Sequence, residues 1–151
     1  MANSYTQIII HLTFHVKEDC QIDKSDLPSL YKYITGIVVA EGGAVFAIGG
    51  VINHVHILFS LPKNATLSSM VMKIKANSSR WLKGQGSQYR AFAWQDGYGA
   101  FSVSASKIDV VAAYIGNQEE HHRKHSFKEE YVEFLKAYNV EYDERYVKNN
   151  D

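Results

Sequence analysis

Apolar and polar residues alternate between residues 5 and 16, a pattern that predicts a half-buried strand. Its apolar positions share one face of the strand: Ile8, Ile10, Leu12, Phe14 and Val16. The opposite face carries polar side chains, among them His11 and His15. These two histidines could contact a ligand or line a site, but the pattern favours a solvated face.

In four later segments the apolar residues recur every three or four positions, and this period predicts helices. Ser106 with Asp109, and Ser126 with Glu129, have the spacing of capping boxes and would begin the last two helices. The predicted helices cover residues 25–42, 66–83, 106–124 and 126–138.

Strand-like segments fill much of the remaining chain: residues 44–48, 51–61 and two short pieces within 91–104. We expect Gly49-Gly50 to form the turn or bulge of a hairpin between the first two. The order of elements predicts an α+β fold, an antiparallel sheet with helices packed on one face, close to the ferredoxin-like pattern. The length suits one domain, 1–151, whose C-terminal helix and tail begin at about residue 126.

Composition narrows the class of protein. Apolar residues make up 46% of the chain and charged residues 21%, a balance typical of globular domains. The chain shows neither an apolar run long enough for a membrane span nor a secretory signal, so we expect a cytoplasmic protein with no membrane partner. Cys20 is the only cysteine, which excludes an intrachain disulfide and a cysteine zinc cage.

Charge is balanced in total but unevenly distributed. Sixteen Lys and Arg residues equal sixteen Asp and Glu residues, which counts against a nucleic-acid-binding domain because such domains are often strongly basic. Residues 63–90, however, contain six basic side chains and no acidic one. Since the distribution of charge matters more than its sum, this basic middle keeps nucleic acid among the candidate partners.

The first candidate for chemistry is His54-Val55-His56, in the middle of a predicted strand. The period of two places both imidazoles on one face, about 7 Å apart along the chain. Two imidazoles on a rigid strand form a good partial metal site that needs a further ligand from elsewhere. The alternative is a surface pair, or a pair satisfied by hydrogen bonds.

The second candidate is Tyr114, in a segment whose apolar spacing predicts a helix. Gln118 lies four residues later and therefore shares its face of the helix. The amide oxygen of Gln118 could reach a metal. The alternative is that Tyr114 is a core aromatic residue, because an apolar stripe already surrounds it.

Taken in order, several segments resemble one family. They are Gly49–Leu58, which contains the histidine pair, Lys73–Arg80, Trp94–Tyr98 and Tyr114–Gln118. At these separations the chain resembles the single-tyrosine HUH transposases of small bacterial insertion sequences, the TnpA type, over roughly residues 5 to 122. Each segment alone is a weak signal, and the ordered set is specific.

The resemblance implies a site and a reaction. His54 and His56 match the metal ligands, Gln118 matches the side chain that completes the metal site, and Tyr114 matches the nucleophile. The implied metal is Mg²⁺ or Mn²⁺, although two imidazoles alone would favour softer metals. The implied fold is ferredoxin-like or RRM-like, and the implied partners are single-stranded DNA with hairpin ends and a second subunit, whose histidines the tyrosine helix can serve.

The implied chemistry is cleavage and rejoining of DNA strands without ATP. The metal would polarise the scissile phosphate, and Tyr114 would attack it to form a 5′-phosphotyrosine and release a 3′-OH. Three other functions remain open: a non-catalytic or domesticated nucleic-acid-binding protein, a replication-type HUH nicking enzyme, and a structural metal-binding domain.

DNA contacts are expected from the basic middle helix and from nearby aromatic residues. Phosphate contacts would come from Lys73, Lys75, Asn77, Ser78 and Arg80. Trp94 and Tyr98 could stack on unpaired bases, or could form a structural turn packed on the sheet. No role is assigned to the helix from Phe127 or to the tail at residues 141–146, for which a dimer contact or a lid over the tyrosine helix are hypotheses.

Overall fold

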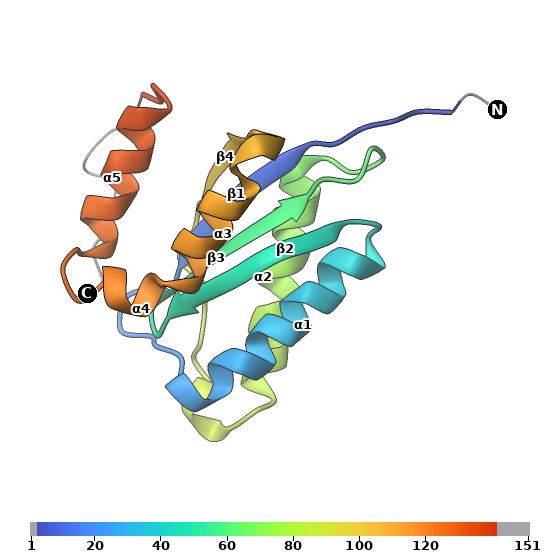
Figure 1. Cartoon of the computed structure of the whole chain (residues 1–151). Helices are drawn as coiled ribbons and strands as arrows, with labels where there is room; N and C mark the ends of the chain where they lie inside the picture. Colours follow the sequence, from blue (N-terminus) through green and yellow to red (C-terminus); the bar gives the residue numbers. More distant parts are fainter. Residues whose placement is uncertain (1–2, 142–151) are drawn as a thin grey trace.

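The computed structural model describes residues 3–141. Within that range four antiparallel strands form one sheet, in the order β2-β3-β1-β4. Figure 1 shows this sheet with helices on either side of it. The strands are β1 (Ile9–His15), β2 (Ala44–Val51), β3 (His54–Ser60) and β4 (Gly99–Val103). The helices are α1 (Leu27–Ala40), α2 (Leu67–Lys83), α3 (Ile108–Gly116), α4 (Gln118–His121) and α5 (Phe127–Ala137).

The larger hydrophobic core lies between one face of the sheet and helices α1 and α2. It takes the alternate apolar residues of β1 and β3, including Leu12, Phe14 and Ile57, all of which are buried. The helices supply residues at helical spacing, such as Leu30 and Ile74. The alternation in sequence therefore predicts this face correctly, and the α+β class is confirmed.

The second face of the sheet is covered as well, which the expectation of helices on one face did not include. Helix α3 packs mainly on β2, and its buried Ile115 joins Leu58 of β3 in a second, smaller hydrophobic cluster. Helix α5 lies over the polar side of β1, where Phe134 contacts the ring of His11. His11 is consequently buried, so the expectation of a solvated strand face is wrong.

The hairpin between β2 and β3 turns later than predicted. Gly49 and Gly50 belong to β2, and the chain turns at Ile52 and Asn53 instead. At Gly49 the reason is close packing against α3, because a Cβ there would lie 2.5 Å from the carbonyl oxygen of Ile115. Only glycine lets β2 approach the tyrosine helix this closely.

Helices α3 and α5, both of which were predicted to begin with a capping box, begin differently. Ser126 caps α5 as predicted, since its side chain accepts a hydrogen bond from the backbone N–H of Glu129. Ser106 does not cap α3: it lies within a short 3-10 helix, Ala105–Lys107, and its hydroxyl contacts Ser104. The expected single helix to residue 124 is also interrupted at Asn117, so that α4 begins at Gln118.

The segment after α2 forms one regular strand, β4, rather than two. The first predicted piece is a single bridge between Trp94 and Val16. No helix within residues 3–141 is long and apolar enough to cross a membrane. Of the region for which a dimer contact or a lid was considered, the helix is described as α5, whereas residues 142–146 of the tail lie outside the described residues, which end at Glu141.

Candidate active site

The two histidines of β3 point to the covered polar face of the sheet. Both are fully buried, and their ring centroids are 5.2 Å apart. The pairing of β1 with β3 sets Thr13 opposite His56 and His15 opposite His54. The strand period thus places the imidazoles together as predicted, in the interior and not on a surface.

One nitrogen of each imidazole is held by a neighbouring side chain. His54 Nδ1 lies 2.7 Å from Asn53 Oδ1, and His56 Nδ1 lies 2.8 Å from His11 Nε2. Such outer contacts fix the orientation of metal-binding histidines and leave the other nitrogen free to bind. Both Nε2 atoms then face α4 and α5, where oxygen atoms meet them.

Helices α3 and α4 bring the other two predicted residues to the same place. Gln118 is 1% exposed, and its Oε1 lies 3.1 Å from His54 Nε2. The Tyr114 ring stands edge-on to His56, with centroids 5.8 Å apart. All four predicted site residues therefore converge within one chain.

Sequence reasoning missed an acidic residue at the centre of this group. Glu130 of α5 is 2% exposed, and its Oε1 lies 2.9 Å from His56 Nε2. Its other oxygen accepts a hydrogen bond from the Tyr114 hydroxyl. Glu130 follows the predicted capping box of α5 by one residue, but nothing in its spacing indicates that α5 folds back over the sheet.

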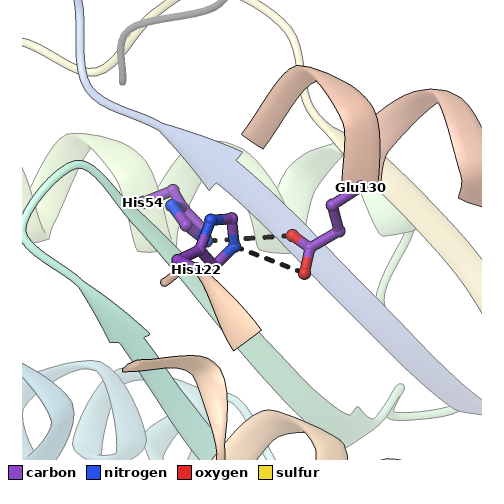
Figure 2. A group of neighbouring side chains, drawn as sticks. All are labelled: His54, His122 and Glu130. Atoms are coloured by element: carbon purple, nitrogen blue, oxygen red, sulfur yellow. Dashed lines mark ion pairs between the residues drawn. The ribbon is translucent and has the colours of Figure 1, made fainter. Parts of the chain in front are cut away.

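Two histidines at the C-terminal end of α4 also reach this carboxylate. His121 Nε2 and His122 Nε2 lie 3.3 and 3.4 Å from Glu130 Oε2. Figure 2 shows His54 and His122 facing the two oxygens of Glu130. Histidines near the C-terminal end of a helix are usually explained by the helix dipole, so their position in the sequence does not by itself indicate this contact. The spacing of four from Tyr114 to Gln118 to His122 was the signal that could have found one of them.

The electrostatics of the site follow from its burial. Burial, together with the charges of His56 and His122, holds the pKa of His54 well below its usual range, so its imidazole is neutral. Burial and then the hydrogen bond and charge of Glu130 raise the pKa of Tyr114. Burial alone would raise the pKa of Glu130, but contacts with His122, His56 and Tyr114 outweigh it and lower that pKa.

The donor set fits a cation. Neutral His54 has one N–H, yet carbonyl oxygens of Asn53 and Gln118 face both its nitrogens. Rotating the Gln118 amide would not help, because its Nε2 already donates to Glu130 Oε2. A lone pair on one nitrogen of His54 therefore faces an acceptor oxygen. A metal ion between them would satisfy both, and imidazole with amide and carboxylate oxygens suits a divalent ion.

Comparison with known proteins identifies the family. Residues 4–118, most of the chain, match the family model described as "Transposase IS200 like". The chain belongs to the IS200-like transposase family. This transposase is therefore an enzyme that cleaves DNA and transfers strands, of the HUH type. Comparison with curated proteins finds no match.

Two solved structures share the fold of the transposase. One is a putative transposase from Deinococcus radiodurans R1, with 20% identity, a TM-score of 0.58, and coverage of 78% of this chain and 96% of that one. The other is a REP-associated tyrosine transposase bound to a REP hairpin, with 15% identity, a TM-score of 0.59, and coverage of 81% and 73%.

The residues predicted to bind DNA divide into two groups. Ser78 and Trp94 are buried in the transposase and bond to each other at 2.9 Å, which leaves neither side chain able to reach DNA. Lys75 donates to the carbonyl oxygens of Gln95 and Gly97 and holds the turn that follows Trp94. The structural-turn alternative for Trp94 is thus the observed one.

The remaining candidates for DNA contact reach the surface. Lys73 pairs with Glu41, Arg80 donates to Asn77, and Tyr98 is 38% exposed. Helix α2, which carries three of these four, packs on the sheet face opposite to the histidine pair. DNA held there would have to pass an edge of the sheet to reach Tyr114.

Proposed function

We propose that the transposase cleaves and rejoins single-stranded DNA through a covalent bond to Tyr114, at a divalent metal held by His54, His56 and Gln118. The observation that carries this proposal is the convergence of the four side chains on the covered face of the sheet. Each comes from a segment that the family resemblance selects. His54, His56 and Gln118 are buried, which argues against a solvated surface role for them, and Tyr114 is partly buried beside them.

In the proposed mechanism, Tyr114 Oη attacks the phosphorus atom of the scissile phosphate. The new O–P bond forms as the P–O3′ bond breaks, so that the 5′ side stays on Tyr114 and the other strand leaves through O3′, which takes up a proton from water to become a 3′-OH. The phenolic proton passes to Glu130 Oε2, the acceptor that Tyr114 already contacts. A divalent cation supplies Lewis-acid polarisation of the phosphate and offsets the negative charge of Glu130.

The reverse reaction needs no further energy source. The phosphotyrosine keeps the energy of the phosphodiester, so a new 3′-OH can attack it, giving its proton to water, and release Tyr114 as a phenolate. Glu130 Oε2 then returns the proton to the phenolate. Cleavage and joining thus use the same residues in opposite directions.

The partners of the reaction follow from the family and from one neighbour. We propose single-stranded DNA with hairpin ends as substrate, supported by the related transposase bound to a REP hairpin. Lys73, Asn77, Arg80 and Tyr98 remain candidates for DNA contact. We further propose Mg²⁺ or Mn²⁺ as the metal, a homodimer as the assembly, residues 1–151 as one domain, and a bacterial cytoplasm as the setting.

The test is capture of the covalent adduct. Labelled single-stranded hairpin DNA is incubated with the transposase and Mn²⁺ and run on a denaturing gel. We expect a protein–DNA adduct with the unaltered chain and with Tyr33→Phe, a matched control on α1. Tyr114→Phe should reduce the adduct at least about a hundredfold, because it removes the attacking oxygen.

Two results would count against the proposal. An adduct that survives Tyr114→Phe would place the nucleophile elsewhere. Binding of the hairpin without any adduct, in the presence of Mn²⁺ or Mg²⁺, would favour the non-catalytic binder.

A further inference from the structure

The carboxylate of Glu130 lies beyond the part of the chain that matches the family model, which ends at residue 118. It is nevertheless the most enclosed acidic group of the described residues, since α5 places it over the histidine pair at 2% exposure. Burial of an ionised carboxylate costs several kcal/mol unless it is paired or binds a metal. Its two oxygens have different neighbours, and this difference indicates a role.

The Oε2 atom is already provided with hydrogen-bond donors. It accepts from the Tyr114 hydroxyl and from Gln118 Nε2, the latter at 3.3 Å. Ring nitrogens of His121 and His122 also lie 3.3 and 3.4 Å from Oε2. The Oε1 atom faces the histidine pair of β3, 2.9 Å from His56 Nε2 and 3.8 Å from His54 Nε2. Because the Nδ1 atoms of these histidines are held from behind by Asn53 and His11, their Nε2 atoms are the ones that a metal would use.

The separations match those of atoms around one ion. At metal–ligand distances of about 2.1 Å in an octahedron, neighbouring ligand atoms lie about 3.0 Å apart and opposite ones about 4.2 Å apart. His54 Nε2 to Gln118 Oε1, at 3.1 Å, and His56 Nε2 to Glu130 Oε1, at 2.9 Å, are neighbouring distances. The 3.8 Å between His54 Nε2 and Glu130 Oε1 falls between the two values.

We propose that Glu130 is a ligand of the metal, binding through Oε1 beside His54, His56 and Gln118. This inference rests on the proposed function, which supplies the other three ligands. The set then contains two imidazoles and a carboxylate, with an amide oxygen as a fourth group. A hard, charged oxygen accounts for Mg²⁺ or Mn²⁺ at a site whose imidazoles alone would favour softer metals.

A ligand on α5 also gives the metal a structural effect. The ion would join β3 to α5, an element that contacts the sheet through rings such as Phe127 and Phe134. Metal binding should therefore stabilise the packing of α5 over Tyr114. Variants that lose the carboxylate should lose this stabilisation even if the histidines still bind the ion.

The experiment measures affinity for Mn²⁺ alone, at pH 8, from the electron paramagnetic resonance signal of the free ion. We expect Glu130→Gln in the full chain to weaken binding by about tenfold or more, the loss typical of an altered metal site. The matched control is Glu129→Gln, which changes an exposed neighbour that can still serve the capping box. The control should bind as the unaltered chain does.

A second measurement guards against misfolding. Thermal unfolding with a chelator establishes that Glu130→Gln is folded, and excess Mn²⁺ should then raise its unfolding temperature less than that of the control. If Glu130→Gln does not fold, Glu130→Asp takes its place. Aspartate keeps the negative charge on a side chain that is one methylene shorter. If Glu130 is a ligand, Glu130→Asp should bind Mn²⁺ more weakly than the Glu129→Gln control.

The outcomes separate this inference from the proposed function. If His54→Ala weakens Mn²⁺ binding and a folded Glu130 variant binds as tightly as the control, the inference is overturned and the proposed site stands. If neither His54→Ala nor the Glu130 variant weakens binding, the proposed metal site itself is misplaced. Weakening by both supports the four-ligand site.

Discussion

At the scale of single residues, His11 shows how covering the polar face changes the chemistry of a strand. Burial, with a smaller contribution from His56, lowers the pKa of His11 to about 3, although Glu130 opposes the shift. Its ring lies against Phe134 of α5 and holds Nδ1 of His56. In the unfolded chain the same imidazole would have a pKa of about 6.5.

The difference in pKa predicts a dependence of stability on pH. The unfolded chain takes up the proton first, so the stabilisation is present above pH 6.5 and is lost as the pH falls toward 3. With a chelator present, the free energy of unfolding should fall by up to about 1.4 kcal/mol per pH unit from this residue. The free energy of unfolding of His11→Gln, measured with urea at several pH values, should depend less steeply on pH than that of the unaltered chain. An equal dependence on pH in the two proteins would contradict the assignment of this effect to His11.

Four site residues could be predicted from the sequence, whereas others, such as Glu130, could not, and the reason is physical. His54 with His56, and Tyr114 with Gln118, each belong to one element, so local periodicity sets their relative positions. Glu130 joins them only because α5 folds back on the sheet, and that packing has no local signature. The same packing of α5 covers the polar face of β1, and for this reason the expectation that this face is solvated was wrong.

At the scale of elements, the close contact of β2 with α3 fixes where the tyrosine helix lies. A methyl group at Gly49 would collide with the backbone of Ile115, one residue after Tyr114. Gly49→Ala should therefore destabilise the chain by about 1–3 kcal/mol, the usual cost of overpacking. Because α3 must move, it should also lower the yield of covalent adduct.

Gly36 provides the matched control for that prediction. It lies in α1, and nothing is within 4 Å of the place where its Cβ would be. Gly36→Ala should stabilise the chain by about 0.5–1 kcal/mol because alanine favours the helix, and adduct formation should not change. Urea unfolding of both variants measures the contrast, and equal effects would show that the contact at Gly49 carries no strain.

Boundaries of elements were less predictable than their existence. The glycine pair at residues 49–50 has the sequence of a turn, yet close packing with α3 keeps it in the strand. Helices α2 and α5 were predicted almost to their ends, whereas β1 begins four residues later than its alternating pattern, at Ile9. Tertiary contacts decide the rest, because a short polar segment has several acceptable conformations.

At the scale of the whole molecule, the described chain brings the proposed nucleophile and the proposed metal ligands together. Tyr114 lies beside His56 of its own chain. We therefore expect mixtures of His56→Ala and Tyr114→Phe to form no more adduct than either variant alone. Recovery of adduct in the mixture, measured on the same denaturing gel, would show that the tyrosine helix serves a partner subunit.

The two faces of the sheet carry cores of very different size. The face toward α1 and α2 buries a large apolar cluster, whereas the other buries fewer apolar residues beside the polar site, among them Leu58, Ile115, Phe101 and Phe127. We therefore expect the layer over Tyr114 to open at a lower free energy than the fold as a whole. Such a local opening would admit a DNA strand while the strands that carry the histidines keep their register against the main core.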